Sequence, residues 1–436
     1  MRKNQIHTYI CYIFIALIGV LVVIQILYGL IQLAGLSKSN NPCYSVTGCF
    51  YNPGPYGCYL AIGFPIALRS MVNYGNRLQK WIGMGMAVLI VILISISMSR
   101  TAIIACIIGS GIALLDHVKN AMSWKLICKF LYVSLCIIIL AVFFYLVKKN
   151  SADGRLLMWK VAVQSAINVP LNGVGWSQVA GAYGKTQELY FASGQGSEQE
   201  MMVADAPEYV FNEYLQIAIA YGPIISMIVI GLIIGGIVEA LRNQSYTLAG
   251  SSAAVAVSMF ASYPMQFPIF IATMCLVVCG TWISSSRQIE ACSACIVIVT
   301  LCILFLTHNN RVDAHTEFLV GCNLHDINDF NKSNEVLLNL TKHSSDPMPL
   351  NIIGKNYQAL GMPDSAAHYF RRAANRCPNR LYPHYLLMQL YADSASYDRD
   401  LMLQEARILA TKKEKVPSPA VDEMRRKALT ILNSHP

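Results

Sequence analysis

Two arginines stand beside long apolar runs, where a charged side chain is costly to place. Arg100 lies in the segment SMSRTAI between two such runs, and Arg155 opens a predicted amphipathic helix over 155–168. An arginine at the centre of a membrane helix costs about 2.5–3.5 kcal/mol on insertion scales, so its presence usually marks a function. Both residues are therefore candidates for a functional, ligand-binding role. The alternatives are a snorkelling Arg100 in a tight turn and an Arg155 that contacts lipid headgroups.

A cluster of polar residues precedes a later apolar run. Asn212, Glu213, Tyr214 and Gln216 follow one another closely, and Glu208 lies four residues before Asn212, on a similar helical face. Glu213 or Glu208 is a candidate general base for a hydroxyl nucleophile, with Asn212, Tyr214 and Gln216 as candidates to bind the substrate. The alternative is that these residues cap a helix N-terminus. The sequence has no zinc, Ser-His-Asp, P-loop or Rossmann pattern, so we expect no metal and no cofactor.

The elements expected to position these residues begin with the helix at 155–168. Its apolar side chains fall on one stripe, which predicts a helix that lies on the membrane surface. The stripe consists of Leu156, Trp159, Val163 and Ile167. The following segment VPLNGVGW, with Pro170, Gly173 and Gly175, predicts a sharp turn.

The composition is that of a membrane protein. Of the 436 residues, 55% are hydrophobic and 13% are charged, whereas soluble domains average about 25% charged residues. We expect an all-α fold, with a polytopic transmembrane bundle of about nine spans in residues 1–307. The predicted spans are 9–34, 54–72, 81–98, 101–116, 126–147, 209–240, 246–262, 265–284 and 289–307, with a break at Gly222-Pro223. The formal charge of +9 is spread along the chain, which fits anionic membrane lipids and does not indicate nucleic acid binding.

Basic residues in the short loops set the expected orientation. With the N-terminus inside, most lysines and arginines of the short loops fall on the cytoplasmic side, and the outer short loops carry chiefly Lys38 and Arg100. This orientation places one large loop, 148–208, and a C-terminal domain, 308–436, on the outer face of the membrane.

The C-terminal domain carries a helical-repeat pattern. The segment 354–378 matches the tetratricopeptide (TPR) helix-turn-helix pattern at its marker positions. These positions are Gly354, Tyr357, Gly361, Ala366, Phe370, Ala373 and Pro378. Gly321 and Leu324 fall in register 33 residues earlier, so we expect two to three degenerate repeats whose concave face binds protein partners. A plain helical hairpin is the alternative.

Taken together, these segments resemble the O-antigen ligase family, whose wider group includes O-antigen polymerases. NPGPYGCYLAIGFP (52–65) is similar to the family's F-x-N-P-N-x-x-A-x-Y-L segment, and SMSRTA to its T-x-S-R-x-A span. GRLLMWKVAVQSAINVPLNGVGW is similar to the R-x-x-x-W…P-x-x-G-x-G loop, and FNEYLQIAIAYG to the H-N-x-Y-L entry helix. A trailing TPR domain is also common in the family. The resemblance covers roughly residues 50–310.

The resemblance implies a chemistry and a place in the cell. A glycan on an undecaprenyl-pyrophosphate carrier would be transferred to a hydroxyl of an acceptor glycolipid or glycan. The reaction would occur at the periplasmic face of the bacterial inner membrane, with the large loop and the C-terminal domain in the periplasm. Arg100 and Arg155 would then hold the pyrophosphate of the donor.

Two departures from the family keep other functions open. Phe211 stands where the family has a histidine before the asparagine, so another base is needed or activity is lost. Family members also usually have more spans before the Asn-Pro segment. The alternatives are a polymerase that joins repeat units and a non-catalytic scaffold that recruits envelope partners through its repeats. A transporter fits less well, because we identify no acidic group deep within the membrane and no internal repeat of spans.

Overall fold

The computed structural model describes residues 2–72, 76–116, 149–285, 288–307, 313–413 and 418–435, and within them all regular elements are helices. The predicted span 126–147 lies outside these residues. The chain divides into two compact units. Unit 1 comprises 1–147, 211–214 and 224–309, and unit 2 comprises 148–210, 215–223 and 310–436.

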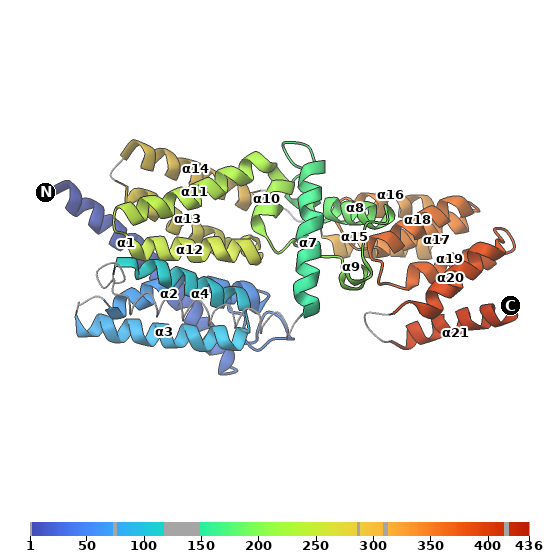
Figure 1. Cartoon of the computed structure of the whole chain (residues 1–436), viewed down its shortest axis with the longest axis horizontal. Coiled ribbons are helices and arrows are strands. Elements are labelled where there is room, and N and C mark those ends of the chain that lie inside the picture. Colours follow the sequence, from blue (N-terminus) through green and yellow to red (C-terminus); the bar gives the residue numbers. More distant parts are fainter. Residues whose placement is uncertain are drawn as a thin grey trace. The chain divides into compact units, whose positions relative to one another are not determined.

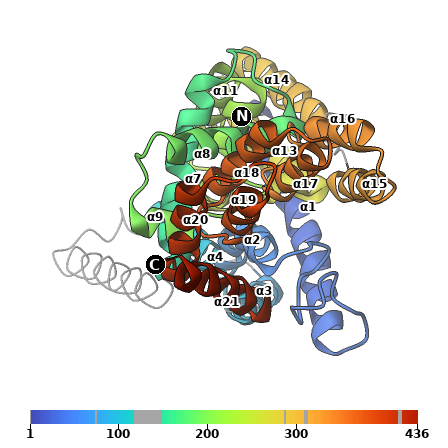
Figure 2. The ribbon, with the colours of Figure 1, turned by 90° about the vertical axis from the view of Figure 1, so that its right-hand side faces the viewer.

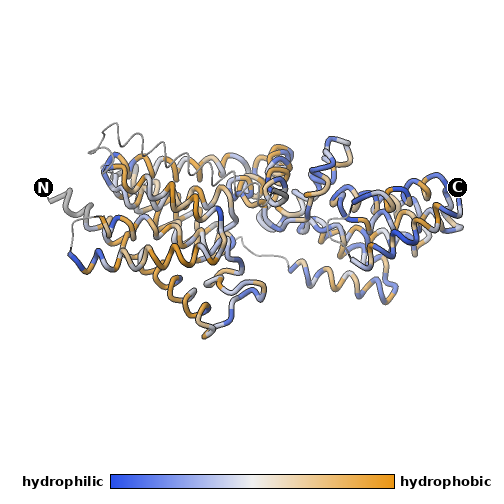
Figure 3. Tube along the Cα trace, turned by 60° about the horizontal axis from the view of Figure 1, so that its bottom comes forward, coloured by the Kyte–Doolittle hydropathy of each residue, from blue (hydrophilic) through white to orange (hydrophobic). Residues whose placement is uncertain are grey.

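Unit 1 is a bundle of apolar helices, which are coloured blue to cyan and yellow to tan in Figure 1 and mostly orange in Figure 3. They are α1 (Arg2–Leu33), α2 (Pro53–Val72), α3 (Arg77–Ser97), α4 (Arg100–Ala113), α11 (Pro223–Arg242), α12 (Tyr246–Ala261), α13 (Pro268–Ile283) and α14 (Gln288–Thr307). Among the described residues, three stretches are long and apolar enough to cross a membrane, namely Tyr9–Leu33, Arg77–Ser97 and Pro223–Arg242. Shorter apolar helices fill Arg100–Ala113, Tyr246–Ala261, Pro268–Ile283 and Ala291–Ile303. The predicted all-α fold with membrane-spanning helices is therefore confirmed, whereas only three of the described helices, not nine, are by themselves long and apolar enough to span a membrane.

Small residues bring the helices of unit 1 into close contact. A Cβ atom added to Gly109 of α4 would lie 2.8 Å from the carbonyl oxygen of Gly250 in α12. Ser251 of α12 donates a hydrogen bond of 2.9 Å to the carbonyl oxygen of Ile62 in α2. Such small-residue contacts and interhelical hydrogen bonds are how helices associate where the surroundings are as apolar as the side chains. They fix α2, α4 and α12 as the centre of the bundle.

The predicted break at Gly222-Pro223 is confirmed. The nine-residue helix α10 (Glu213–Tyr221) ends just before Gly222, and α11 begins at Pro223. Gly222 has a φ of +89°, and a Cβ atom there would meet the carbonyl oxygen of Leu171 at 1.8 Å. Proline then starts the next helix, where its missing N–H costs nothing. Residues 215–223 belong to unit 2, so the chain passes between the units within α10.

Unit 2 joins the large loop to the C-terminal helices in one compact body. Its first part contains α7 (Lys149–Asn168), a short 3₁₀ turn (Trp176–Gln178), α8 (Val179–Ala192) and α9 (Glu198–Val203). The predicted turn at 170–175 is present, and the N–H groups of Val174 and Gly175 donate to the carbonyl oxygens of Ile219 and Ala220 at the end of α10. The loop expected at 148–208 is therefore a folded helical layer.

The C-terminal part of unit 2 is a row of helices in which each packs on the next, shown in orange to red in Figure 2. They are α15 (Ala314–Asp326), α16 (Phe330–Leu340), α17 (Met348–Ala359), α18 (Pro363–Arg376), α19 (Tyr382–Ala392), α20 (Arg399–Thr411) and α21 (Pro419–Ser434). Gly321 faces Leu337, and 33 residues later Gly354 faces Phe370 in the same way. In each pair the glycine lets the larger side chain of the neighbouring helix fit against the backbone.

One face of α8 is packed against this row. Cβ atoms on Gly181 and Gly184 would meet the backbone of Lys342 and Ser345 at 2.0 and 2.8 Å, so only glycine permits the observed approach. One turn further along α8, the Glu188 carboxylate forms salt bridges of 2.6 Å with Arg372 and 2.9 Å with Arg376. The side chains of Glu188 and Arg376 are 9% and 1% exposed. The contact is therefore a buried, charged junction inside unit 2.

Candidate active site in unit 1

Arg100 lies between Ser99 and Thr101, and the side chain of each of these two neighbours forms a hydrogen bond to another helix. It is the first residue of α4, and Ser99 is the N-cap, whose hydroxyl accepts from the N–H of Ala102. The Ser99 hydroxyl also lies 3.3 Å from the carbonyl oxygen of Gly54, at the start of α2. The Thr101 hydroxyl donates to the carbonyl oxygen of Ala261, at the end of α12, at 3.0 Å. The starts of α2 and α4 and the end of α12 therefore meet around Arg100.

This position favours an anion. The N-terminus of a helix carries a partial positive charge and unpaired N–H groups, and a guanidinium group adds a full positive charge there. Arg100 itself is half-buried. A cation at a helix N-terminus is unfavourable for the helix, so the position of Arg100 does not serve helix stability.

Glu213 contacts the turn that follows the end of α12. Its Oε1 atom accepts a hydrogen bond of 2.7 Å from the N–H of Met265, which is in the 3₁₀ turn Pro264–Gln266 between α12 and α13. The side chain is fully buried, and its Oε2 atom has no hydrogen-bond partner among the described residues. The α10 helix lies outside the candidate spans, and burial raises the pKa of this carboxyl to about 8, partly opposed by the Met265 hydrogen bond.

The turn between α12 and α13 thus links the two candidate segments; the sequence predicted a break between spans here but not its part in the site. Thr101 bonds to Ala261 and Glu213 to Met265, four residues apart in the chain. Phe211 packs edge-on against Tyr263, with ring centroids 4.7 Å apart. The two prolines of the segment SYPMQFP (262–268) are the feature of the sequence that predicts a turn between apolar runs at this place.

The other predicted binding residues of this segment have structural contacts. Asn212 is 5% exposed. The Tyr214 hydroxyl donates to the carbonyl oxygen of Ala256 at 3.1 Å. Gln216 is 2% exposed, belongs to unit 2, and accepts from the N–H of Val210 at 3.2 Å. The Tyr214 and Gln216 bonds help to hold α10 in place.

The expectation that Glu208 shares a helical face with Asn212 is wrong. Residues 204–212 are not helical, since α10 begins only at Glu213 and Phe211 has a φ of +54°. Glu208 is exposed and belongs to unit 2, whereas Glu213 belongs to unit 1. Helical spacing therefore does not relate the two carboxylates, and Glu213 is the buried one.

Arg155 is not in the first turn of its helix, as the sequence predicted. The α7 helix begins at Lys149, so Arg155 lies in its second turn, half-buried, within unit 2. Of the predicted stripe, Leu156, Val163 and Ile167 are exposed, at 57%, 44% and 76%. Trp159 instead packs against the core between α7 and α8.

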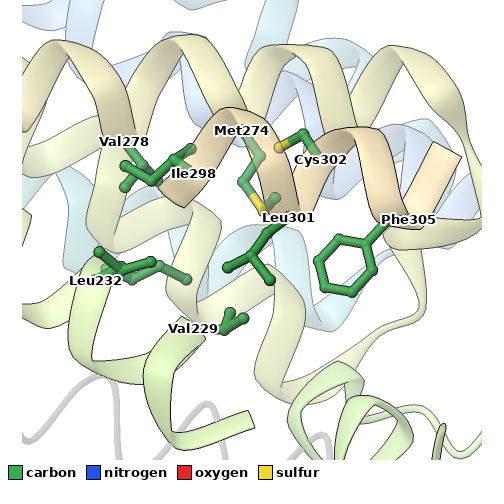
Figure 4. A pocket seen from close by; sticks show the side chains of 9 residues that line it. Val229, Leu232, Met274, Val278, Ile298, Leu301, Cys302 and Phe305 are labelled. Atoms are coloured by element: carbon green, nitrogen blue, oxygen red, sulfur yellow. The ribbon is translucent and has the colours of Figure 1, made fainter. Parts of the chain in front are cut away.

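Two further features complete the description of the site. Among the described residues there is no group of three His, Cys, Asp or Glu side chains that suits a metal ion. A small pocket between α11, α13 and α14 is lined only by apolar side chains, including Val229, Leu232, Met274 and Phe305 (Figure 4). Cys302 is the one ionisable group in its lining, which contains no carboxylate, histidine or lysine.

The helices and the site define an integral membrane protein with a buried carboxyl and an arginine at one turn of its bundle. Residues 85–230 match the model of the family described as O-antigen ligase (Wzy_C). No curated protein and no solved structure matches the chain. The match confirms the resemblance for this segment, which contains Arg100, Arg155, Glu208 and Glu213, and supports glycan transfer from a lipid carrier, of the ligase or polymerase type.

Proposed function

We propose that the protein transfers a glycan from an undecaprenyl-pyrophosphate carrier to a hydroxyl of an acceptor glycolipid or glycan. The reaction takes place at the periplasmic face of the bacterial inner membrane. The observation that carries the proposal is the family match over 85–230, because it covers both segments that the turn between α12 and α13 links.

Arg100 binds the pyrophosphate of the donor. The α4 N-terminus and the guanidinium group both attract negative charge, which grows on the leaving group as the sugar–oxygen bond breaks. The resemblance implies a role in pyrophosphate binding for Arg155 as well. Asn212 and Tyr214 line the acceptor side, together with Gln216.

Glu213 acts as the general base in place of the histidine that Phe211 replaces. The acceptor oxygen forms a bond to the anomeric carbon of the donor sugar, and its proton moves to the Glu213 carboxylate. The bond from the anomeric carbon to the pyrophosphate oxygen breaks, and its electron pair leaves with the undecaprenyl pyrophosphate. The Oε2 atom of Glu213 supports this role, because among the described residues it has no hydrogen-bond partner and keeps an unused acceptor position. Glu208 is the alternative base.

The C-terminal helices form TPR-like repeats that bind protein partners of the cell envelope. The 33-residue spacing of the Gly321–Leu337 and Gly354–Phe370 contacts supports this assignment. The proposed domains are a membrane domain over 1–307 and a periplasmic repeat domain over 308–436.

The test uses purified full-length protein in lipid nanodiscs with an undecaprenyl-pyrophosphate-linked glycan and an acceptor glycolipid. We expect transfer by the wild type and at least a hundredfold slower transfer by Arg100→Ala and Glu213→Gln, with normal insertion of both variants. Wild-type rates in both variants would contradict the proposed site. Absence of transfer by the wild type would favour the second candidate, a scaffold, which Phe211 supports because it removes the family histidine.

A further inference from the structure

The layer formed by α7 and α8 in unit 2 contains a cavity that the proposed reaction does not use. Its volume is about 280 Å³, near the lower end of the range for small-molecule sites, roughly 300–1,000 Å³. Its polar lining residues include Gln164 and Asn168 of α7 and Gln195, which follows α8. The side chains of Ile167 and Leu189 add apolar surface at 76% and 57% exposure.

One wall of the cavity is held rigidly. Tyr190 is 4% exposed, and its hydroxyl accepts from Lys160 at 2.7 Å and lies 2.9 Å from Glu200 Oε2. Lys160 also pairs with Glu200 Oε1 at 2.8 Å. The pKa of Glu200 falls to about 2, because hydrogen bonds from Lys160, Ser197 and Tyr190 outweigh the opposing effect of burial. The charges of Lys160 and Glu200, which both bond to the Tyr190 hydroxyl, therefore neutralise each other.

The mouth of the cavity offers neutral hydrogen-bonding groups. Among the described residues, the side-chain amides of Gln164, Asn168 and Gln195 have no hydrogen-bond partner. Each amide has two donors and one acceptor oxygen. The lining contains no charged side chain.

This combination suits a sugar ring. Sugar hydroxyls both donate and accept hydrogen bonds, and the C–H faces of a pyranose pack on apolar and aromatic surfaces. A phosphate or a charged peptide would find no counter-charge in the lining. From the cavity between α7 and α8, with its three unpaired amides and its fixed tyrosine, we propose that unit 2 contains a binding site for a neutral pyranose unit of the transferred glycan. The identity of the ligand as a glycan rests on the proposed function.

The direct test measures sugar binding by full-length protein in lipid nanodiscs, free of sugar-headed detergent. The probes are the methyl glycosides of glucose, galactose and N-acetylglucosamine, followed by saturation-transfer NMR. We expect a saturable signal for at least one probe and a loss of at least fivefold in Gln164→Leu and in Asn168→Leu. Gln195→Ala, at an exposed position outside any helix, gives a second variant that leaves the fold intact. The matched control is Gln178→Leu, an amide outside the lining.

The outcomes separate this site from the proposed function. Binding that the pocket variants lose and the control keeps supports the site, whether or not the wild type transfers glycan. Transfer by the wild type with no sugar binding, or binding that the pocket variants retain, would overturn the site and leave the transfer reaction standing. In the transfer assay, a site that binds glycan predicts a raised KM for the donor or the acceptor in Gln164→Leu, with kcat changed less than twofold.

Discussion

The junction between α8 and α18 gives the sharpest prediction about stability. Glu188→Leu would leave Arg376, at 1% exposure, without its counter-charge. Removing one partner of a buried ion pair costs about 3–5 kcal/mol, whereas replacing the whole pair by apolar groups is often neutral. Burial lowers the pKa of Arg376, and the Glu188 carboxylate is the main group that opposes this effect. We therefore expect a loss of about 3–5 kcal/mol in Glu188→Leu and recovery of most of it in Glu188→Leu/Arg376→Met.

The assay is amide hydrogen exchange of α8 and α18 in the full-length protein, followed by mass spectrometry. Because about 1.4 kcal/mol corresponds to a tenfold change, exchange in these helices should quicken by roughly two to more than three orders of magnitude. Glu198→Gln, at an exposed carboxyl of α9, is the matched control and should leave exchange unchanged. Unchanged protection in Glu188→Leu, or a double variant as unstable as the single one, would refute the reasoning.

Three further predictions concern the site and the turn beside it. In the wild type, the transfer rate should rise with pH and level off above about 8. Burial raises the pKa of the Glu213 carboxyl, which acts as a base only when it is deprotonated. A pH–rate profile that stays flat between pH 6 and 9 would contradict this. Arg100→Lys keeps the charge but loses the two-pronged geometry, so donor KM should rise about tenfold or more, with Lys80→Arg as control; an unchanged KM would remove Arg100 from donor binding. Gly222→Ala should destabilise the protein by more than about 1 kcal/mol, since φ is +89° and a Cβ would meet the carbonyl oxygen of Leu171 at 1.8 Å. The control is Gly231→Ala, where an added Cβ would meet no atom within 4 Å. Equal thermal unfolding of the two variants would contradict the prediction.

The helices of the bundle and the break at Gly222-Pro223 were predictable because local sequence determines them. An apolar run of helix length determines a helix, and a Gly-Pro pair ends one, without contacts to distant parts of the chain. The start of α7 was predicted too late, at Arg155, whereas the helix begins at Lys149 and includes Gly154. Tertiary packing overrides weak local propensity in such a segment.

The contacts that organise the site and unit 2 were not predictable from local patterns. Glu188 and Arg376 are 188 residues apart in the sequence, and Thr101 and Ala261 are 160 apart. The four-residue spacing of Glu208 and Asn212 led to a wrong prediction, because this spacing places two residues on one face only within a helix. The glycines at 181 and 184 carried a signal for close packing, but the sequence does not identify the partner surface.

The most direct test of the proposed function is the glycan profile of a strain that lacks this protein, measured on the acceptor and on the lipid carrier together. The account predicts that transferred glycan disappears from the acceptor and accumulates on undecaprenyl pyrophosphate, and that wild-type protein, but not Glu213→Gln, reverses both changes. Single repeat units on the acceptor would indicate a polymerase instead. If neither pool changes, glycan transfer by this protein is contradicted.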